Sequence, residues 1–182
     1  MPYPADISQA PEAFTLISDT VLGADAASFD VQNIPQGYKH LQFILMGRGD
    51  TGAISSAVRL QFNGDTSAIY DFIEGSFDSG GFNGVAASMA QTSITVGYIT
   101  AATATADRVG IVTMDIPSYS QTTFDKMVNS QRSIIWGTAA ANMEMGHHGG
   151  VWRSTAAINR IVLSLSAGNF LAGSRLTLYG LG

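Results

Sequence analysis

The chain has 182 residues, of which 46% are apolar and 13% are charged, and its formal net charge is −5. The apolar share is enough for a sizeable core, whereas the charged share is about half of the usual one, which is typical of a subunit that neighbours cover. The only lysines are Lys39 and Lys126 and no basic cluster is present, so no nucleic-acid partner is expected, and no apolar stretch is long enough to span a membrane.

The first residues predict an extended arm. Met1–Glu12 contains three prolines, and proline fixes φ and removes a backbone donor. The alternative for a proline-rich terminal segment of this kind is a disordered tail. We therefore divide the chain into an N-terminal arm, residues 1–12, and a single β-sandwich domain, residues 13–182. Contacts with a capsid or a neighbouring subunit are expected from Pro2, Tyr3, Pro4 and Ile7.

Two early segments carry strand signals. In Tyr38–Met46 both faces are largely apolar, which predicts a strand in the middle of a sheet. Farther on, Asn63-Gly64 separates the alternating run Val58–Phe62 from the run Ala68–Ile73. Asn-Gly between two such runs is a strong hairpin signal. We therefore expect these two runs to pair.

The middle of the chain is less regular. Gly75–Gly84 is rich in glycine and contains Phe77 and Phe82, which predicts a long ordered surface loop with both rings as a possible rim contact. Val85–Ala90 is expected to be one helical turn or irregular. Further strands are predicted at Thr92–Ile99, Arg108–Ile116, Phe124–Val128 and Ser133–Trp136.

The C-terminal residues predict an antiparallel pair. Ile158–Leu165 and Ser174–Leu181 each alternate apolar and polar positions, and a glycine-bracketed connection separates them. Together the patterns give about ten short antiparallel strands and no convincing amphipathic helix. The expected fold is an all-β, jelly-roll-like β-sandwich with an extended N-terminal arm.

No pattern in the sequence nominates a catalytic, metal or cofactor site. The absence of cysteine excludes disulfides, thiolate metal sites and cysteine nucleophiles. His147 and His148 are adjacent, so in a strand they would point to opposite faces and could not easily share a metal. Arg48-Gly49-Asp50 is interpreted as ordinary turn chemistry. The carboxylates Asp25, Asp50, Asp65 and Asp78 lie in turns, where Asp accepts hydrogen bonds from local backbone.

Several motifs resemble small virion proteins of tailed bacteriophages. They are NIPQGYKHL at residues 33–41, Arg48, LQFNGDT at residues 60–66, Tyr70, GVW at residues 150–152, GNF at residues 168–170 and GSRLTLYG at residues 173–180. The resemblance extends over residues 14–182. It implies a β-sandwich or jelly-roll domain that decorates the capsid or belongs to the tail, and it brings no active site.

The expected function is therefore structural. The resemblance implies a capsid decoration (cement) protein that bridges subunits of the major capsid protein, often as a homotrimer. Its expected location is the capsid surface of the virion, after synthesis in the host bacterial cytoplasm. The alternative is a tail-fibre or receptor-binding domain that recognises host surface glycan through the aromatics near residues 75–84. An enzyme, such as an envelope depolymerase, is not expected, because no carboxylate pair is nominated.

Overall fold

The computed structural model describes residues 14–182 as twelve strands and one short 3-10 helix. The strands are β1 (Phe14–Val21), β2 (Ser28–Val31), β3 (His40–Gly47), β4 (Ser55–Phe62), β5 (Tyr70–Asp78), β6 (Gly81–Gln91), β7 (Ile94–Thr100), β8 (Gly110–Pro117), β9 (Lys126–Ile135), β10 (Met143–Trp152), β11 (Ile161–Leu165) and β12 (Arg175–Leu181). The helix η1 (Ala140–Asn142) lies between β9 and β10. The predicted arm and its four contact residues lie outside the described residues. Within residues 14–182, no helix is long and apolar enough to cross a bilayer.

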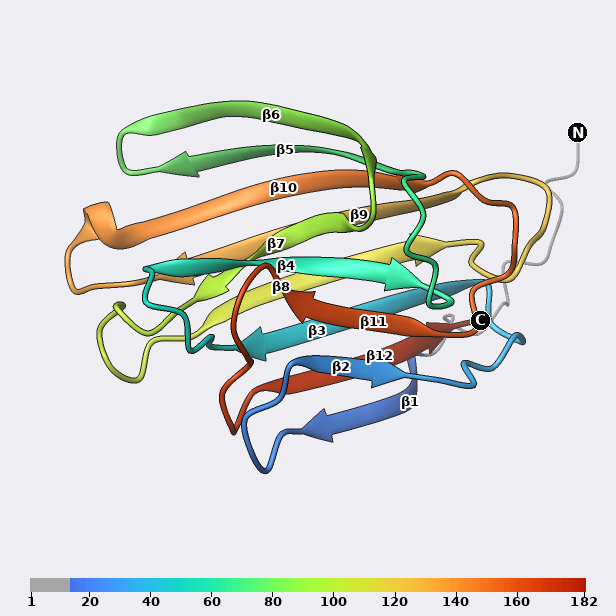
Figure 1. The fold of residues 1–182 in the computed structure, drawn as a ribbon, viewed down its shortest axis with the longest axis horizontal. Coiled ribbons are helices and arrows are strands. Elements are labelled where there is room, and N and C mark those ends of the chain that lie inside the picture. Colours follow the sequence, from blue (N-terminus) through green and yellow to red (C-terminus); the bar gives the residue numbers. More distant parts are fainter. Residues whose placement is uncertain (1–13) are drawn as a thin grey trace, which may run out of the picture.

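Two antiparallel sheets of unequal size pack face to face as a jelly-roll-like β-sandwich (Figure 1). The large sheet has eight strands in the order β1-β12-β3-β8-β9-β10-β5-β6, and the small sheet has four in the order β2-β11-β4-β7. Every pairing between these strands is antiparallel. The predicted all-β sandwich is confirmed, with twelve strands in residues 14–182 where about ten were expected.

The core follows directly from period-two alternation. In β3, the side chains of Leu41, Phe43 and Leu45 are buried between the sheets, whereas Ile44 and Met46 are exposed on the opposite face. This strand lies between β12 and β8, inside the sheet as predicted. The largest fully buried apolar side chains of the core are Tyr70, Tyr119, Phe43, Phe62, Phe170, Leu41, Leu45, Leu60, Ile94, Ile99 and Met114.

The Asn63-Gly64 turn exists, but the hairpin predicted from it is wrong. Both residues have positive φ, 53° and 72°, and the N–H of Asp65 donates to the carbonyl of Phe62 at 2.9 Å. After this turn the chain crosses from β4 in the small sheet to β5 in the large sheet. The buried Tyr70 hydroxyl fixes the crossing, since it accepts from the Phe62 N–H at 3.1 Å and donates to the Asp65 carbonyl at 3.0 Å.

The predicted C-terminal pair is also wrong, because its two strands belong to different sheets. β11 pairs with β2 and β4, and β12 pairs with β1 and β3. The connection between them is fastened by Asn169, whose N–H and side-chain amide donate to the Asp50 carboxylate at 2.7 and 2.9 Å. Phe170 of the same connection is buried in the core. Alternation identifies the inward face of each strand, but it does not identify the partner strand.

The segment predicted as a surface loop, Gly75–Gly84, belongs to the β5–β6 hairpin, and so does Val85–Ala90. Both predictions are therefore wrong. β5 pairs with β10 on one side and with β6 on the other, and these contacts outweigh the low strand propensity of glycine. The N–H of Gly80 donates to Oδ1 of Asp78 at 2.7 Å and closes the hairpin turn. Likewise, the two short strands expected within residues 124–136 are the single strand β9.

Glycines let β7 approach the large sheet closely, which gives a first prediction. A Cβ at position 150 would lie 2.5 Å from Cγ2 of Ile94, so Gly150→Ala should lower the free energy of unfolding by about 1–3 kcal/mol, the usual cost of overpacking. Its neighbour Gly149 points to the opposite face, where a Cβ would lie 3.6 Å from Cγ2 of Ile73. Gly149→Ala should therefore change stability by no more than about 0.5 kcal/mol. Urea unfolding measures both variants, and equal losses would contradict this packing.

Candidate functional site

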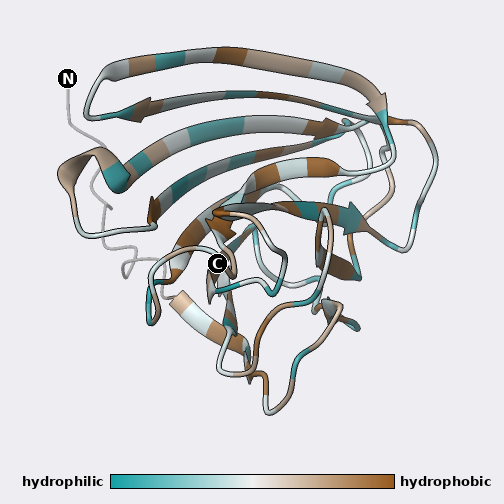
Figure 2. Ribbon diagram, turned by 60° about the vertical axis from the view of Figure 1, so that its left-hand side comes forward, coloured by the Kyte–Doolittle hydropathy of each residue, from teal (hydrophilic) through white to brown (hydrophobic). Residues whose placement is uncertain are grey.

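The large sheet extends beyond the small one at the β5–β6 end. The small-sheet strand β7 packs against β8, β9 and β10, and only slightly against β5. Figure 1 shows β5 and β6 beyond the edge of the small sheet, and Figure 2 shows them at the far end of the sandwich. The structure therefore offers two candidate surfaces: the inner side of this overhang, and the outer face of the whole large sheet.

A cluster of polar side chains, the inner polar cluster, lies where the overhang begins. It consists of Glu74 on β5, Tyr98 on β7, Arg132 on β9, and Glu144 and His148 on β10. Nδ1 of His148 lies 3.2 Å from Oε2 of Glu74, and the Tyr98 hydroxyl donates to Oε1 of Glu74 at 3.1 Å. The Arg132 guanidinium pairs with Glu144 and lies over the Tyr98 ring, 4.4 Å from its centroid. Strands of both sheets are thus joined through charged groups.

Local geometry explains why these side chains point inward. In β9 the inward positions Val128, Ser130, Arg132 and Ile134 alternate with exposed ones. Arg132 can lie across β10 because residue 146 is glycine: a Cβ there would lie 2.7 Å from its Nε. The two adjacent histidines point to opposite faces, as predicted, since His148 is only 2% exposed whereas His147 is exposed.

The electrostatics of the cluster favour a charged Glu74. The close contact with His148 is the main cause that lowers the pKa of Glu74, helped by Tyr98 and Arg132 and opposed by burial. Burial, and then the charge of Glu74, raise the pKa of the Tyr98 hydroxyl. Among the described residues, Nε2 of His148 and Nε of Arg132 are buried without a hydrogen-bond partner, and Nδ1 of His148 and Oε2 of Glu74 have only their 3.2 Å contact with each other. The cluster therefore keeps unused hydrogen-bonding capacity in a place that is largely shielded from water.

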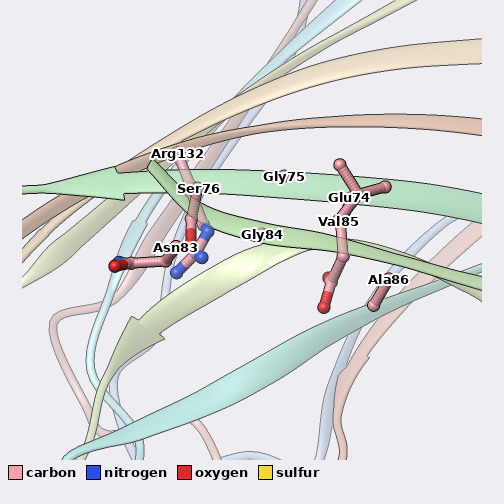
Figure 3. Close-up of a pocket in the computed structure, with 8 residues that line it drawn as sticks. All are labelled: Glu74, Gly75, Ser76, Asn83, Gly84, Val85, Ala86 and Arg132. Atoms are coloured by element: carbon pink, nitrogen blue, oxygen red, sulfur yellow. The ribbon is translucent and has the colours of Figure 1, made fainter. Parts of the chain in front are cut away.

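A small cavity of about 200 Å³ adjoins this cluster on the inner side of the β5–β6 hairpin. Its polar lining comes from Glu74, Ser76, Asn83 and Arg132, and Gly84 and Ala86 leave space beside them. Figure 3 shows Asn83 and Arg132 at one end of the cavity, with Glu74 farther along the strand. Carboxylate, amide and guanidinium groups in one small cavity suit a small ligand rich in hydroxyl groups.

The outer face of the large sheet is a second candidate, because it is exposed and mostly uncharged. One row of direct register partners crosses the six neighbouring strands β3, β8, β9, β10, β5 and β6. In that order its residues are Met46, Ile111, Ser133, Met145, Phe77 and Phe82. Further exposed apolar side chains on the large sheet are Phe14, Leu16, Val21, Ile44, Ile73, Val85, Met89, Met127 and Met143. A hollow of about 460 Å³ at one end is lined in part by Phe77, Met143 and Met145.

Few charges interrupt this outer face. On β8 the outward acid Asp115 accepts a hydrogen bond from Gln42 on β3 at 2.9 Å. On β12, Arg175 is paired with Asp19 of β1 at 2.6 Å, and this arginine lowers the pKa of the Asp19 carboxyl. The low charged fraction of the sequence is thus reflected in a broad sheet face with little net charge. Such a face is typical of a surface that another macromolecule covers.

The predicted rim residues, Phe77 and Phe82, lie together on the outer face. Their ring centroids are 5.2 Å apart, and both rings are exposed. They do not border the inner cavity, which faces the opposite side of the same hairpin. Sequence reasoning missed the inner polar cluster, because its members are far apart in the chain. The available signal was an arginine, Arg132, at an inward position of an alternating strand.

The other sequence candidates have structural roles. Arg48 donates to the backbone carbonyls of Ala102, Ala104, Thr105 and Arg108, and thereby fixes the loop before β8. As predicted, the carboxylates of Asp65 and Asp78 accept backbone N–H groups two residues on, at 2.8 and 2.7 Å. Asp25 and Asp50 instead accept the N–H groups of Ala172 and Asn169 in the β11–β12 connection, at 2.8 and 2.7 Å, and so join distant loops. Within residues 14–182, no group of three or more His, Cys, Asp or Glu residues could hold a metal ion.

The comparisons with known proteins are weak. No family model and no curated protein matches the chain. Among solved structures, it is similar to exo-inulinase from Aspergillus awamori, with 10% identity and a TM-score of 0.38 over 96% of this chain and 30% of that one. It is also similar to a galectin of Caenorhabditis elegans, with 9% identity, a TM-score of 0.34, and 90% and 95% of the two chains covered. A third similar structure is the CBM40 of Ruminococcus gnavus IT-sialidase bound to alpha2,3 sialyllactose. It has 9% identity and a TM-score of 0.32, over 92% of this chain and 95% of that one.

The chain thus spans 30% of the length of the exo-inulinase. Identities and TM-scores this low carry no inference about function.

Glu74→Gln tests the inner polar cluster. At pH 7 it should lower the free energy of unfolding by about 1.5–3 kcal/mol, the usual contribution of hydrogen bonds to a charged group. Because folding lowers the pKa of Glu74 from its ordinary 4.5, its contribution is complete above pH 4.5 and is lost as the pH falls through the lowered value. The difference in free energy of unfolding between wild type and variant should therefore become smaller on acidification.

Urea unfolding between pH 7 and pH 3 measures this difference. Asp107→Asn, which changes an exposed loop carboxylate, is the control and should leave stability within about 0.5 kcal/mol of wild type. A difference for Glu74→Gln that stays constant over the whole pH range would contradict the assigned role of the carboxylate.

Proposed function

We propose that the chain is a structural protein of a tailed-bacteriophage virion, most directly a capsid decoration (cement) protein that bridges subunits of the major capsid protein. The observation that supports this most is the exposed, weakly charged outer face of the large sheet. In this role the chain sits on the capsid surface after synthesis in the host cytoplasm. The homotrimer and the contacts of the N-terminal arm are further parts of the proposal and rest on the sequence resemblance.

The size of the outer face suits such a contact. Eight strands at the usual spacing, each about eight residues long, form a face of about 34 by 26 Å, or on the order of 900 Å². A stable interface buries about 800 Å² on each partner. A cement protein acts by covering several capsid subunits at once, so that many modest contacts add up. Exposed methionines also suit this role, because their flexible side chains adapt to irregular partner surfaces.

Met145→Glu tests the outer face. The Met145 side chain is 58% exposed in the centre of the apolar row, so the variant should fold normally. Its carboxylate would lose water on docking, and affinity for undecorated phage heads should fall roughly tenfold or more. Co-sedimentation with heads measures the binding, and thermal unfolding verifies the fold.

The matched control is Ile54→Glu, which makes the same change at a 49% exposed position in the loop before β4. It should bind heads as the wild type does. Equal binding by all three proteins would contradict the docking of this face on the capsid.

The second candidate function is recognition of host surface glycan by a tail-fibre or receptor-binding domain. The inner cavity is the observation that favours it, because Glu74, Asn83 and Arg132 present acceptor and donor groups that sugar hydroxyls can bind. The polar lining and small volume suit one sugar unit better than an extended chain. Neither proposal includes a catalytic step.

Binding to host cells and to purified envelope glycan tests this candidate. If the cavity binds the sugar, Asn83→Ala should weaken binding roughly tenfold while Phe82→Ala leaves it unchanged. If the sugar instead stacks on the exposed rings of Phe77 and Phe82, Phe82→Ala should weaken binding and Asn83→Ala should leave it unchanged. No binding by the wild-type protein to cells or glycan would exclude the glycan function.

A further inference from the structure

The last strand of the large sheet, β6, is a long edge without the usual protection. It spans Gly81–Gln91, eleven residues with no Asp, Glu, Lys, Arg or Pro. Most of the strand is white to brown in Figure 2, which shows it at the outer limit of the sheet. Proteins commonly protect such edges with charges, proline, short strands or a covering segment. The small-sheet edges differ, since β2 has four residues and β7 is largely buried.

The backbone of β6 has a regular central stretch whose outer side is open. Gly84–Ser88 pairs in continuous register with Phe72–Ser76 of β5, and one bulge lies at each end of this stretch. In an antiparallel strand, alternate N–H and C=O groups point away from the existing partner. Apart from its backbone ladder with β5, β6 has side-chain hydrogen bonds in the described residues only near its C-terminal end, where the Ala90 N–H donates to Asp71 of β5 and the Gln91 side chain donates to the Met89 carbonyl. The central outward groups are therefore available to another strand.

We propose that β6 pairs antiparallel with β6 of a second copy, around a two-fold axis close to Ala86. In a two-fold contact the residue on the axis faces its own copy, and the residues beside it lie diagonally across from theirs, so a charge near the axis would lie close to a like charge. The central residues, Gly84–Ser88, are small and uncharged and avoid this penalty. A register centred on Ala86 places Gly84 opposite Ser88, and Val85 opposite Ala87. No bulky pair blocks the approach of the two backbones.

A strand pair alone buries less than the roughly 800 Å² per partner of a stable complex, so flanking side chains must contribute. Phe82, Val85 and Met89 are exposed apolar residues of the same strand and supply this area. The pairing joins two large sheets edge to edge and sets their outer faces side by side. It uses only the β6 margin of the outer face and leaves the rest of that face free, so it does not depend on capsid binding. A trimer held by other contacts would be linked to its neighbours through this pair.

Because the natural chain has no cysteine, a single introduced cysteine gives a clean cross-linking test. Ala86→Cys lies close to the proposed axis and should form a disulfide-linked dimer under mild oxidation. Thr66→Cys, exposed in the loop after β4, is the control and should remain monomeric on a non-reducing gel. Val85→Cys and Ala87→Cys determine the register if the axis is displaced by one residue.

Charge substitutions identify the partner as a second copy. Ala87→Lys and Ala87→Glu should each weaken the dimer roughly tenfold in sedimentation equilibrium, whereas an equimolar mixture should recover a mixed dimer. A wild-type chain that is monomeric at all concentrations would overturn the proposal. So would an oligomer that survives both substitutions and is not cross-linked through Ala86→Cys. Failure here with normal head binding leaves the proposed function intact, so the two claims fail separately.

Discussion

The inequality of the two sheets is the constraint on which the rest of the molecule depends. Eight strands pack against four, so the small sheet covers only part of the inner face. Where β7 covers it, the approach is close enough to require glycine at Gly110 and Gly150. Beyond β7, the β5–β6 hairpin extends over an inner surface that the core cannot use. The inner cavity and the open edge are both consequences of this overhang, and the outer face is exposed because no third layer within residues 14–182 covers it.

The two faces of the large sheet differ in chemistry as well as in exposure. The inner face changes from apolar to polar where the small sheet ends, through Glu74, Arg132 and His148. Burying these groups is costly unless they are paired, which restricts how the β5–β6 hairpin can sit on the sandwich. The outer face is broad and nearly uncharged, and it suits a macromolecular partner, whereas the cavity suits only a small ligand. This contrast in area is the reason that assembly is the first proposal and glycan recognition the second.

Period-two alternation predicted the all-β fold and the opposite orientation of His147 and His148. Strand partners were not predictable in this way, because alternation is the same whichever strand lies alongside. The Asn63-Gly64 turn leads to another sheet because Tyr70 fixes the crossing to the large sheet. The loop predicted at Gly75–Gly84 followed from the low strand propensity of glycine, which pairing on both sides of β5 overrides. The inner polar cluster unites residues from four strands, and only the folded chain brings them together.

Copy number per particle tests the central claim most directly, by quantitative mass spectrometry of virions purified from the phage that encodes this chain. A decoration protein occupies sites repeated over the whole shell, so we expect a copy number of the same order as that of the major capsid protein. Only a few copies per particle would place the chain in the tail or a fibre, and absence from purified virions would contradict a structural role in the virion altogether.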